Sequence, residues 1–291
     1  MVVFGGANTS DRRGGPLTKF SGPPHQPVRT VPRSDVHWRF LATPPLAGAE
    51  NMALDEALLR RARATGEAVF RVYGWATPTL SLGRNQPARG EYDTAELARR
   101  GVGIVRRLTG GRAVLHAREV TYSVTAPVGL GATLGAAYGR INELLVTGLR
   151  ALGAPAEIAA VTAPAPRPSL APCFEEPTAG ELVLGGRKLV GSAQYREDDA
   201  LLQHGSILVD DDQPLVASLA RTAVPTPPPV ATLRAALGRA PEPGEPAAAF
   251  LEAVRSREDP HVAPLDLDDG LELAMREALP RYLSSEWTWR R

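Results

Sequence analysis

The sequence predicts a protein of the mixed α/β class, in which strands and helices alternate around one large core. Short runs of alternating or continuously apolar residues recur between residues 36 and 209 and are typical of strands. Two long segments, 47–64 and 136–152, carry the apolar spacing of helices. After a proline-rich stretch at 225–229 the pattern is helical only. We therefore expect one large domain with a small helical C-terminal segment packed on it.

Length and composition bound the class of protein. A chain of 291 residues with 43% hydrophobic and 22% charged residues is typical of a folded globular protein. The net charge of +1 gives no reason to expect nucleic acid or an anionic membrane as a partner. No apolar run approaches the roughly 18 residues that span a bilayer, and no secretory signal is visible. One cysteine excludes an internal disulfide and fits a reducing cytoplasm, where we expect the protein.

Three segments are expected along the chain. Residues 1–34 are rich in Gly, Pro, Ser and Arg without periodicity, which predicts a disordered extension. Residues 35–222 form the main domain, and residues 223–291 form a proline-rich linker and the helical segment. The expected strands of the first half are 36–43, 69–73, 79–82, 103–108 and 120–126, with a short one after 154. The expected helices are 47–64, 94–100, 136–152, 213–220, 230–238, 246–257 and 267–283.

Polar residues crowd the first turns of the helix expected at 47–64. They are Glu50, Asn51, Asp55 and Glu56. Acidic side chains there suit the positive end of the helix dipole. For most of them we expect a solvated turn, and the alternative is contact with a ligand pocket.

The segment Thr109-Gly110-Gly111 is predicted to form a tight turn between two strands. Glycine there allows positive φ and exposes backbone N–H groups that can hold an anion or a carbonyl oxygen. A plain hairpin turn is the simpler interpretation, because the segment is neither a Walker loop nor G-x-G-x-x-G.

A three-stranded meander is predicted after residue 179. Residues 180–184 alternate as a short strand, and Gly185-Gly186 then form a two-residue hairpin connection of type I′ or II′. Residues 187–196 return as a second strand, and 201–209 form a third.

Lysine usage singles out one residue of this meander. Of the 33 basic residues only Lys19 and Lys188 are lysines, and the other 31 are arginines. A position that keeps lysine needs a compact ammonium rather than a planar guanidinium. Gly191-Ser192-Ala193 follows Lys188, and three small residues in a strand indicate the close approach of a ligand or another backbone. We therefore predict a functional role for Lys188, against the alternative of a stray lysine on a solvated hairpin.

Cys173 is the second candidate. It lies between Pro172 and Phe174 in a loop, and loops on a rigid scaffold often carry reactive groups. A free thiol titrates near ~8.5, and a nearby ammonium favours its thiolate. The alternative, that the cysteine is a small buried hydrophobe, stays open at this point.

The histidines predict no metal centre. His116 and His204 lie in the structured part, but neither has a histidine or aspartate neighbour at metal-ligand spacing. No G-x-S-x-G elbow and no H-E-x-x-H motif is present.

Three blocks in this order resemble the signatures of the lipoate/biotin ligase and acyltransferase superfamily. They are RVYGWATPTLSLGRNQ (71–86), RRLTGGRAVLHAREVTYSV (106–124) and GGRKLVGSAQYR with LLQHGSIL (185–208). The resemblance covers roughly residues 36–220. It implies a class II aminoacyl-tRNA synthetase/biotin ligase-like fold, with a central mixed, largely antiparallel sheet flanked by helices.

Within the superfamily the chain resembles most closely the cysteine-dependent octanoyltransferases. Cys173-Phe174-Glu175-Glu176-Pro177 precedes the block of Lys188 as in that family, although an Ala-Pro is more usual at 176–177 and an aspartate after His116. The resemblance implies that Cys173 carries the acyl group as a thioester and that Lys188 lowers the pKa of the thiol. The substrate-binding residues that it implies are Arg71, Arg107, Thr109, Gly110, Gly111, His116, Gly191, Ser192, Ala193, Gln194 and His204.

The resemblance also implies the partners. The donor would be octanoyl-acyl carrier protein, and the acceptor a lysine of a lipoyl domain, as in glycine cleavage H protein or a 2-oxoacid dehydrogenase E2. No cofactor and no metal are implied, because a thioester is already activated for amide formation. Apolar strands around Gly191-Ser192-Ala193 would form the acyl tunnel.

Three alternatives stay open on the sequence. An ATP-dependent lipoate–protein ligase would share the same blocks and would form a lipoyl-adenylate. An amidotransferase would move the acyl group between lipoyl domains through the same kind of cysteine. A non-catalytic subunit that binds lipoyl domains would leave Cys173 unreactive.

Overall fold

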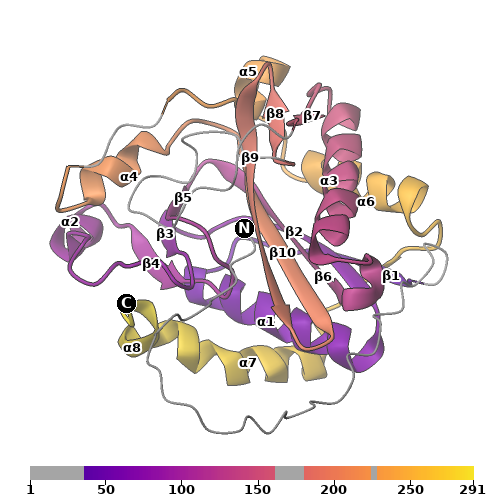
Figure 1. The fold of residues 1–291 in the computed structure, drawn as a ribbon, viewed down its shortest axis with the longest axis horizontal. Helices are drawn as coiled ribbons and strands as arrows, with labels where there is room; N and C mark the ends of the chain where they lie inside the picture. The colour runs from indigo at the N-terminus through magenta and orange to yellow at the C-terminus, as the bar shows by residue number, and fades with distance from the viewer. Residues whose placement is uncertain (1–35, 161–179, 224–227) are drawn as a thin grey trace, which may run out of the picture.

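A computed structural model describes residues 36–160, 180–223 and 228–291 (Figure 1). The predicted extension 1–34, Cys173 and residues 225–227 of the predicted linker lie outside these ranges. The strands are β1 Trp38–Ala42, β2 Ala68–Tyr73, β3 Thr79–Leu82, β4 Gly103–Arg106, β5 Val114–His116, β6 Glu119–Pro127, β7 Glu157–Ile158, β8 Leu182–Leu184, β9 Arg187–Glu197, β10 Ala200–Leu208 and β11 Ala263–Pro264. The helices are α1 Gly48–Thr65, α2 Thr94–Arg99, η2 Val128–Leu130, α3 Leu134–Ala151, α4 Pro214–Leu219, α5 Leu233–Leu237, α6 Glu245–Arg257, α7 Asp269–Leu283 and α8 Ser285–Thr288.

An eight-stranded mixed sheet forms the centre of the molecule. Its strand order is β11-β1-β2-β6-β10-β9-β8-β7. The long strands β6, β10 and β9 pair antiparallel, whereas β1 pairs in parallel with both β2 and β11. The mixed, largely antiparallel sheet that the sequence predicted is confirmed.

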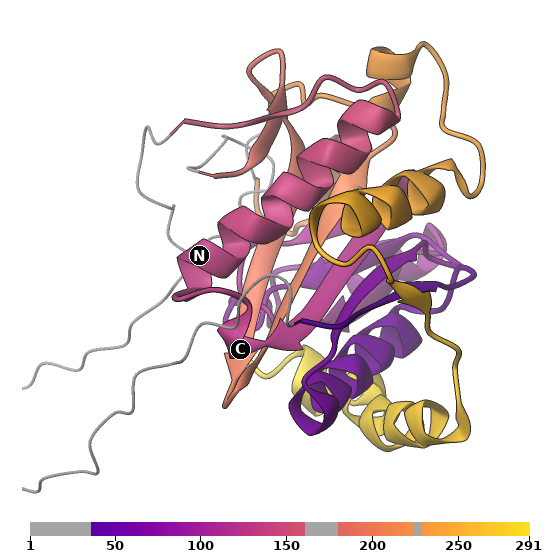
Figure 2. The ribbon, with the colours of Figure 1, turned by 90° about the vertical axis from the view of Figure 1, so that its right-hand side faces the viewer.

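Helices cover both faces of this sheet (Figure 2). On one face lie α3 and α6, where Ile141 and Phe250 join Phe70 of β2 in one apolar cluster. On the other lie α1 and α7, where Leu54 packs with Val69 of β2 in a second cluster. Successive side chains of a strand point to opposite faces, so neighbouring residues of β2 supply two different cores. Among the described residues, no helix is both long enough and apolar enough to cross a membrane.

A second, three-stranded sheet was not predicted. Its order is β4-β3-β5, so β4 and β5 both pair with β3 rather than with each other. The predicted hairpin turn at Thr109-Gly110-Gly111 is therefore wrong, and the strand expected at 103–108 ends at Arg106. The backbone crosses Gly83 instead, where an added Cβ would lie 1.9 Å from the Gly111 carbonyl oxygen. Only glycine at position 83 permits this crossing.

The predicted hairpin between β8 and β9 is confirmed. Gly185 and Gly186 have φ angles of 56° and 73°, both in the left-handed region that a type I′ turn requires. The strand expected at 180–184 begins only at Leu182, and its pairing with β9 shifts register between Leu182 and Val183.

The C-terminal residues complete the sheet as well as packing on it. The unpredicted strand β11 pairs with β1, and the ring of Phe250 lies against α3 at Gly148, where an added Cβ would lie 2.3 Å from it. Helix α7 packs along α1, as Figure 2 shows. The following helix α8 is tied to β4, because Arg106 Nε donates to Thr288 O at 2.8 Å.

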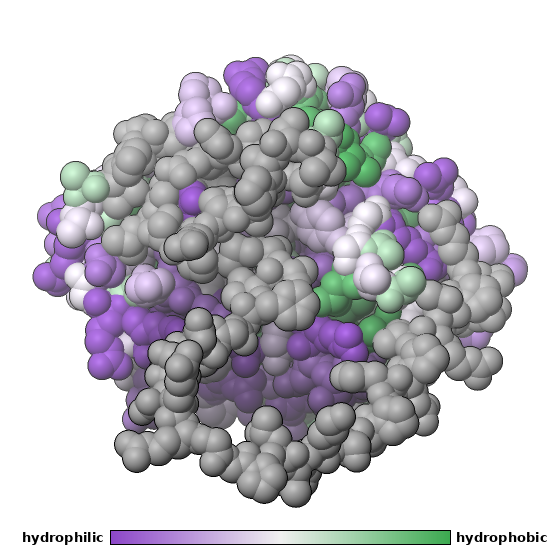
Figure 3. Space-filling view, in the orientation of Figure 1, coloured by the Kyte–Doolittle hydropathy of each residue, from purple (hydrophilic) through white to green (hydrophobic). Residues whose placement is uncertain are grey.

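The surface at α2, on the left of Figure 3, is hydrophilic. Arg99 and Arg100 both pair there with Glu96.

Candidate active site

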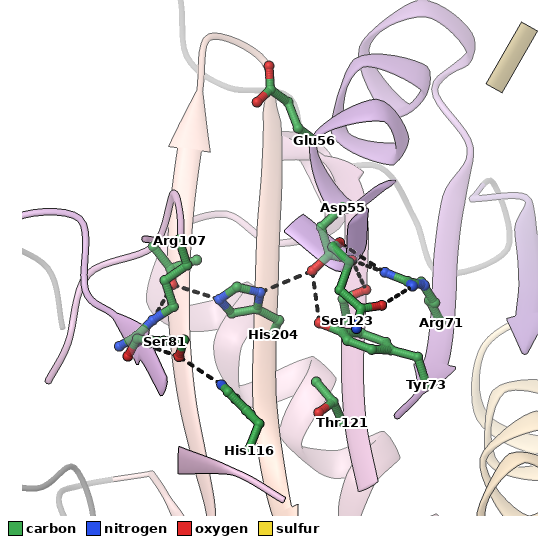
Figure 4. A network of polar contacts seen from close by, with 12 residues as sticks. Asp55, Glu56, Arg71, Tyr73, Ser81, Arg107, His116, Thr121, Ser123 and His204 are labelled. Atoms are coloured by element: carbon green, nitrogen blue, oxygen red, sulfur yellow. Dashed lines mark hydrogen bonds and ion pairs between the residues drawn. The ribbon is translucent and has the colours of Figure 1, made fainter. Parts of the chain in front are cut away.

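A pocket lies between the central sheet, helix α1 and the small sheet. Its empty space, open mouth included, is about 450 Å³. Apolar side chains that include Met52, Trp75 and Val114 line part of it, and Gly191 and Gly205 line it with backbone. The polar residues at its wall belong to a continuous network (Figure 4).

Asp55 joins four side chains at one end of this network. Its Oδ1 accepts hydrogen bonds from Arg71 Nη1 and Ser123 Oγ, both at 2.8 Å. Its Oδ2 lies 3.1 Å from both Tyr73 Oη and His204 Nδ1. The side chains of Arg71 and Asp55 are 0% and 1% exposed, so each buried charge depends on the other.

The surroundings of Asp55 and His204 set their charges. Burial alone would raise the pKa of Asp55, but the hydrogen bond from His204 and the charge of Arg71 hold it below its ordinary value. Burial lowers the pKa of His204, against the opposing effect of Asp55. Neutral pH therefore leaves Asp55 ionised and His204 neutral. With Nδ1–H donated to Asp55, His204 Nε2 accepts from the Thr109 hydroxyl 2.7 Å away.

A second carboxylate–histidine–hydroxyl chain lies on the other side of the pocket. His116 Nδ1 is 2.7 Å from Glu119 Oε1, and His116 Nε2 is 2.7 Å from Ser81 Oγ. Glu119 also accepts hydrogen bonds from Thr121 and Ser206. The His116 ring stacks on Trp75 with centroids 4.0 Å apart, which fixes its plane.

Arg107 connects the two chains. Its Nε donates to Thr109 Oγ1 at 3.2 Å, and its Nη1 donates to Ser81 Oγ at 3.0 Å. Its Nη2 donates to Gly110 O at 2.9 Å and so holds the loop that crosses Gly83. One guanidinium therefore orders the hydroxyl group at the end of each chain.

A different network lies on the α3 face of the same sheet. Gln203 Nε2 donates to Tyr122 Oη at 2.9 Å and to Asn142 Oδ1 at 3.0 Å, and Gln194 Nε2 donates to Gln203 Oε1 at 3.0 Å. Tyr122 Oη donates to Ser192 Oγ at 2.7 Å across Gly205, where an added Cβ would lie 2.8 Å from the Tyr122 ring. Neutral amides and hydroxyls therefore tie β6, β9, β10 and α3 together.

Lys188 lies on β9 on this side. Its side chain is 3% exposed, and its Nζ donates to Glu181 Oε1 at 2.8 Å. The alternative of a solvated lysine is therefore wrong. Cys173, the predicted nucleophile, lies outside the described residues.

The predicted substrate-binding residues divide between the pocket and its support. Arg107, Gly111, His116, Gly191, Ser192, Ala193 and His204 line the pocket. The other four are not among the lining residues. Arg71 binds Asp55, Thr109 binds His204, Gly110 accepts a hydrogen bond from Arg107, and Gln194 belongs to the network on the α3 face.

The solvated turn expected for most polar residues at the start of α1 is wrong. Asn51, Asp55 and Glu56 are buried rather than solvated, and only Glu50 caps the helix, by accepting from the Ala47 N–H. Asn51 and Asp55 lie four positions apart and flank Leu54. Their place on the apolar face of the helix was the feature from which their burial could have been predicted. Ser81 and Glu119 gave no signal, because nothing local distinguishes them.

No group of three or more His, Cys, Asp or Glu side chains suited to a metal occurs among the described residues. Both pocket histidines are instead held by a carboxylate on one nitrogen and a hydroxyl on the other.

The fold is that of the lipoate protein ligases. A crystal structure of lipoate-protein ligase A bound with ATP superposes with a TM-score of 0.71 at 22% identity, over 87% of this chain and 99% of that one. A bipartite lipoate protein ligase from Thermoplasma acidophilum gives 0.67 at 20%, over 87% of this chain and 96% of that one.

Residues 47–255 match the lipoyl protein ligase A/B catalytic domain, and the chain belongs to this family. The octanoyltransferase LipM of Kyrpidia tusciae is 47% identical over 60% of this chain and 67% of its own length. That of Carboxydothermus hydrogenoformans is 46% identical over 60% and 66%. The LipM of Brevibacillus brevis is 35% identical over 87% of this chain and 99% of its own. These relatives make the chain an acyltransferase and support octanoyl transfer in protein lipoylation.

Proposed function

We propose that this protein transfers an octanoyl group from acyl carrier protein to a lysine of a lipoyl-domain protein, such as glycine cleavage H protein, through a thioester on Cys173. The likeness to LipM octanoyltransferases carries the proposal. The pocket beside β9 and β10 supports it with an apolar, glycine-lined space.

The proposed reaction has two steps. The Cys173 thiolate attacks the octanoyl carbonyl, and the carrier leaves as its thiol after it takes up one proton. The neutral amine of the acceptor lysine then attacks octanoyl-Cys173, the C–S bond breaks to release the Cys173 thiolate, and the nitrogen gives one proton to solvent as the amide bond forms. A thioester is activated enough to acylate an amine, so neither step requires ATP.

The chain's own residues would assist both steps. Lys188 would stabilise the thiolate and, with backbone N–H groups, the oxyanion of each tetrahedral intermediate. Arg71, Arg107, Thr109, Gly110, His116 and His204 would shape the wall that receives the acyl chain. Gly191, Ser192, Ala193 and Gln194 would let that chain approach the backbone of β9.

Intact mass spectrometry tests this proposal. After incubation with octanoyl-acyl carrier protein, we expect a mass increase of one octanoyl group located on Cys173, and its loss on addition of a lipoyl domain. Cys173→Ala should abolish both. Full transfer by Cys173→Ala, or an adduct on another residue, would refute the thioester.

The two lysines provide a matched control. Lys188→Arg retains a positive charge but not the compact ammonium, so we expect a loss of transfer of at least about tenfold. Lys19→Arg makes the same change in the N-terminal extension and should transfer normally. Formation of lipoyl-adenylate from lipoate and ATP, without acylation of Cys173, would instead assign the chain to the ATP-dependent ligases.

A further inference from the structure

A buried carboxylate faces the lysine on which the proposed mechanism depends. Glu181 and Lys188 are 7% and 4% exposed, and Lys188 Nζ donates to Glu181 Oε1 at 2.8 Å. Glu181 immediately precedes β8, and Lys188 stands opposite Val183 in the pairing of β8 and β9. Burial disfavours an ammonium, whereas a carboxylate at hydrogen-bonding distance favours it.

The backbone beside Glu181 is held from two sides. Asn142 Nδ2 of α3 donates to the Gly180 carbonyl at 2.6 Å, and the Ala159 N–H donates to the Glu181 carbonyl at 2.8 Å. Asn142 is itself oriented by Gln203 Nε2, and both amides are 0% exposed. The α3-face network therefore ends at the residue before Glu181.

We infer that Glu181 is a positioning residue that keeps Lys188 in its ammonium form and in place, and that Asn142 and Gln203 fix Glu181 for this task. The inference rests on the proposed function for its role in catalysis. The ion pair and its support stand on geometry alone.

Three charged side chains near Lys188 are either exposed or form ion pairs with other residues. Arg187, next to Lys188 on β9, is exposed. Glu143 of α3 lies 3.8 Å from Arg257, and Arg234 of α5 pairs with Asp210. The Glu181 carboxylate forms a buried ion pair with Lys188.

Lysine-selective labelling tests the inference directly, because the chain has only two lysines. The ¹³C resonance of each Cε, followed against pH by NMR, reports the charge of Lys188, with Lys19 as internal reference. In Glu181→Gln we expect Lys188 to lose its proton at least about one pH unit lower than in the wild type. An unchanged titration, or one moved to higher pH, would overturn the inference.

Three further variants keep the test decisive. Asn142→Leu should move the titration of Lys188 in the same direction by less, whereas Thr147→Val, on the exposed side of the same helix, should leave it unchanged. Glu181→Asp should restore part of the transfer rate that Glu181→Gln loses, with little change in KM for the donor. Equal loss of rate in the Asp and Gln variants would contradict a role for the carboxylate.

The outcomes separate this inference from the proposed function. The titration of Lys188 is measured without any acyl donor, so it remains valid even when Cys173 is never acylated. Acylation of Cys173 together with an unmoved Lys188 titration in Glu181→Gln would leave the thioester standing and reject the role of Glu181.

Discussion

The two faces of strand β10 carry polar networks of different chemistry. His204 points toward α1 and forms a hydrogen bond with the ionised Asp55, which pairs with Arg71. Gln203, its neighbour, points toward α3 and belongs to a chain of neutral amides and hydroxyls. The charged network borders the pocket, whereas the neutral one joins strands to a helix. Along β10, ionised groups therefore lie on the face that borders the pocket, and neutral groups lie on the face that packs against α3.

The largest effect should come from breaking the charged face. Asp55→Leu leaves the guanidinium of Arg71 buried without its carboxylate, and we expect a loss of about 3–5 kcal/mol in the free energy of unfolding. Urea denaturation measures it. Arg71→Met in the same background should recover part of the loss, since the uncompensated charge is removed. A loss below 1 kcal/mol for Asp55→Leu would mean that the two faces do not differ as described.

The neutral face should respond less. Gln203→Leu leaves the Asn142 carbonyl and the Gln194 amide without a partner, and we expect a loss of about 1–3 kcal/mol in the free energy of unfolding. The same denaturation experiment measures it. A loss equal to that of Asp55→Leu would remove the distinction between ionised and neutral support.

Acid should distinguish the faces without any mutation. The pKa of His204 is lowered by burial in the folded protein, while an unfolded histidine titrates near ~6.5. Below that value the unfolded chain binds a proton that the folded chain does not, so stability is full above it and falls as pH decreases. We expect the free energy of unfolding to fall as the pH decreases below about 6.5. The lowered pKa of Asp55 acts in the same direction, below about 4.

Two histidine variants identify the source of this fall. His204→Gln should flatten the dependence of unfolding free energy on pH above 5.5, whereas His261→Gln, at an exposed position, should retain it. An unchanged slope in His204→Gln would show that another group is responsible.

The smallest effect should come from a charge pair on neither face. Glu252 and Arg255 on α6 form an ion pair with side chains 60% and 45% exposed. Arg255→Ala should change the free energy of unfolding by less than about 0.5–1 kcal/mol, and added salt should reduce even that. A larger loss would show that exposed pairs matter as much here as the buried pair of Asp55.

The sequence predicted local features better than contacts between distant segments. The glycine pair 185–186 predicted its hairpin because a two-residue turn depends only on its own backbone. The isolated lysine at 188 predicted a functional role because this chain otherwise uses arginine, and that role stays a prediction. Ser81 and Glu119 were missed, because their meaning arises only when His116 lies between them. The small sheet was missed for the same reason, since β3 pairs with strands that follow it only after long excursions.

The parallel pairing at the edge of the main sheet has a consequence for biosynthesis. Arg39 stands beside Ala263 in the register of β1 and β11, so this edge of β1 stays unpaired until the distant strand β11 has been translated. Contacts of such high sequence separation form late and slowly. During synthesis we therefore expect β1 to present an unpaired edge for some time. Chaperones bind such exposed edges.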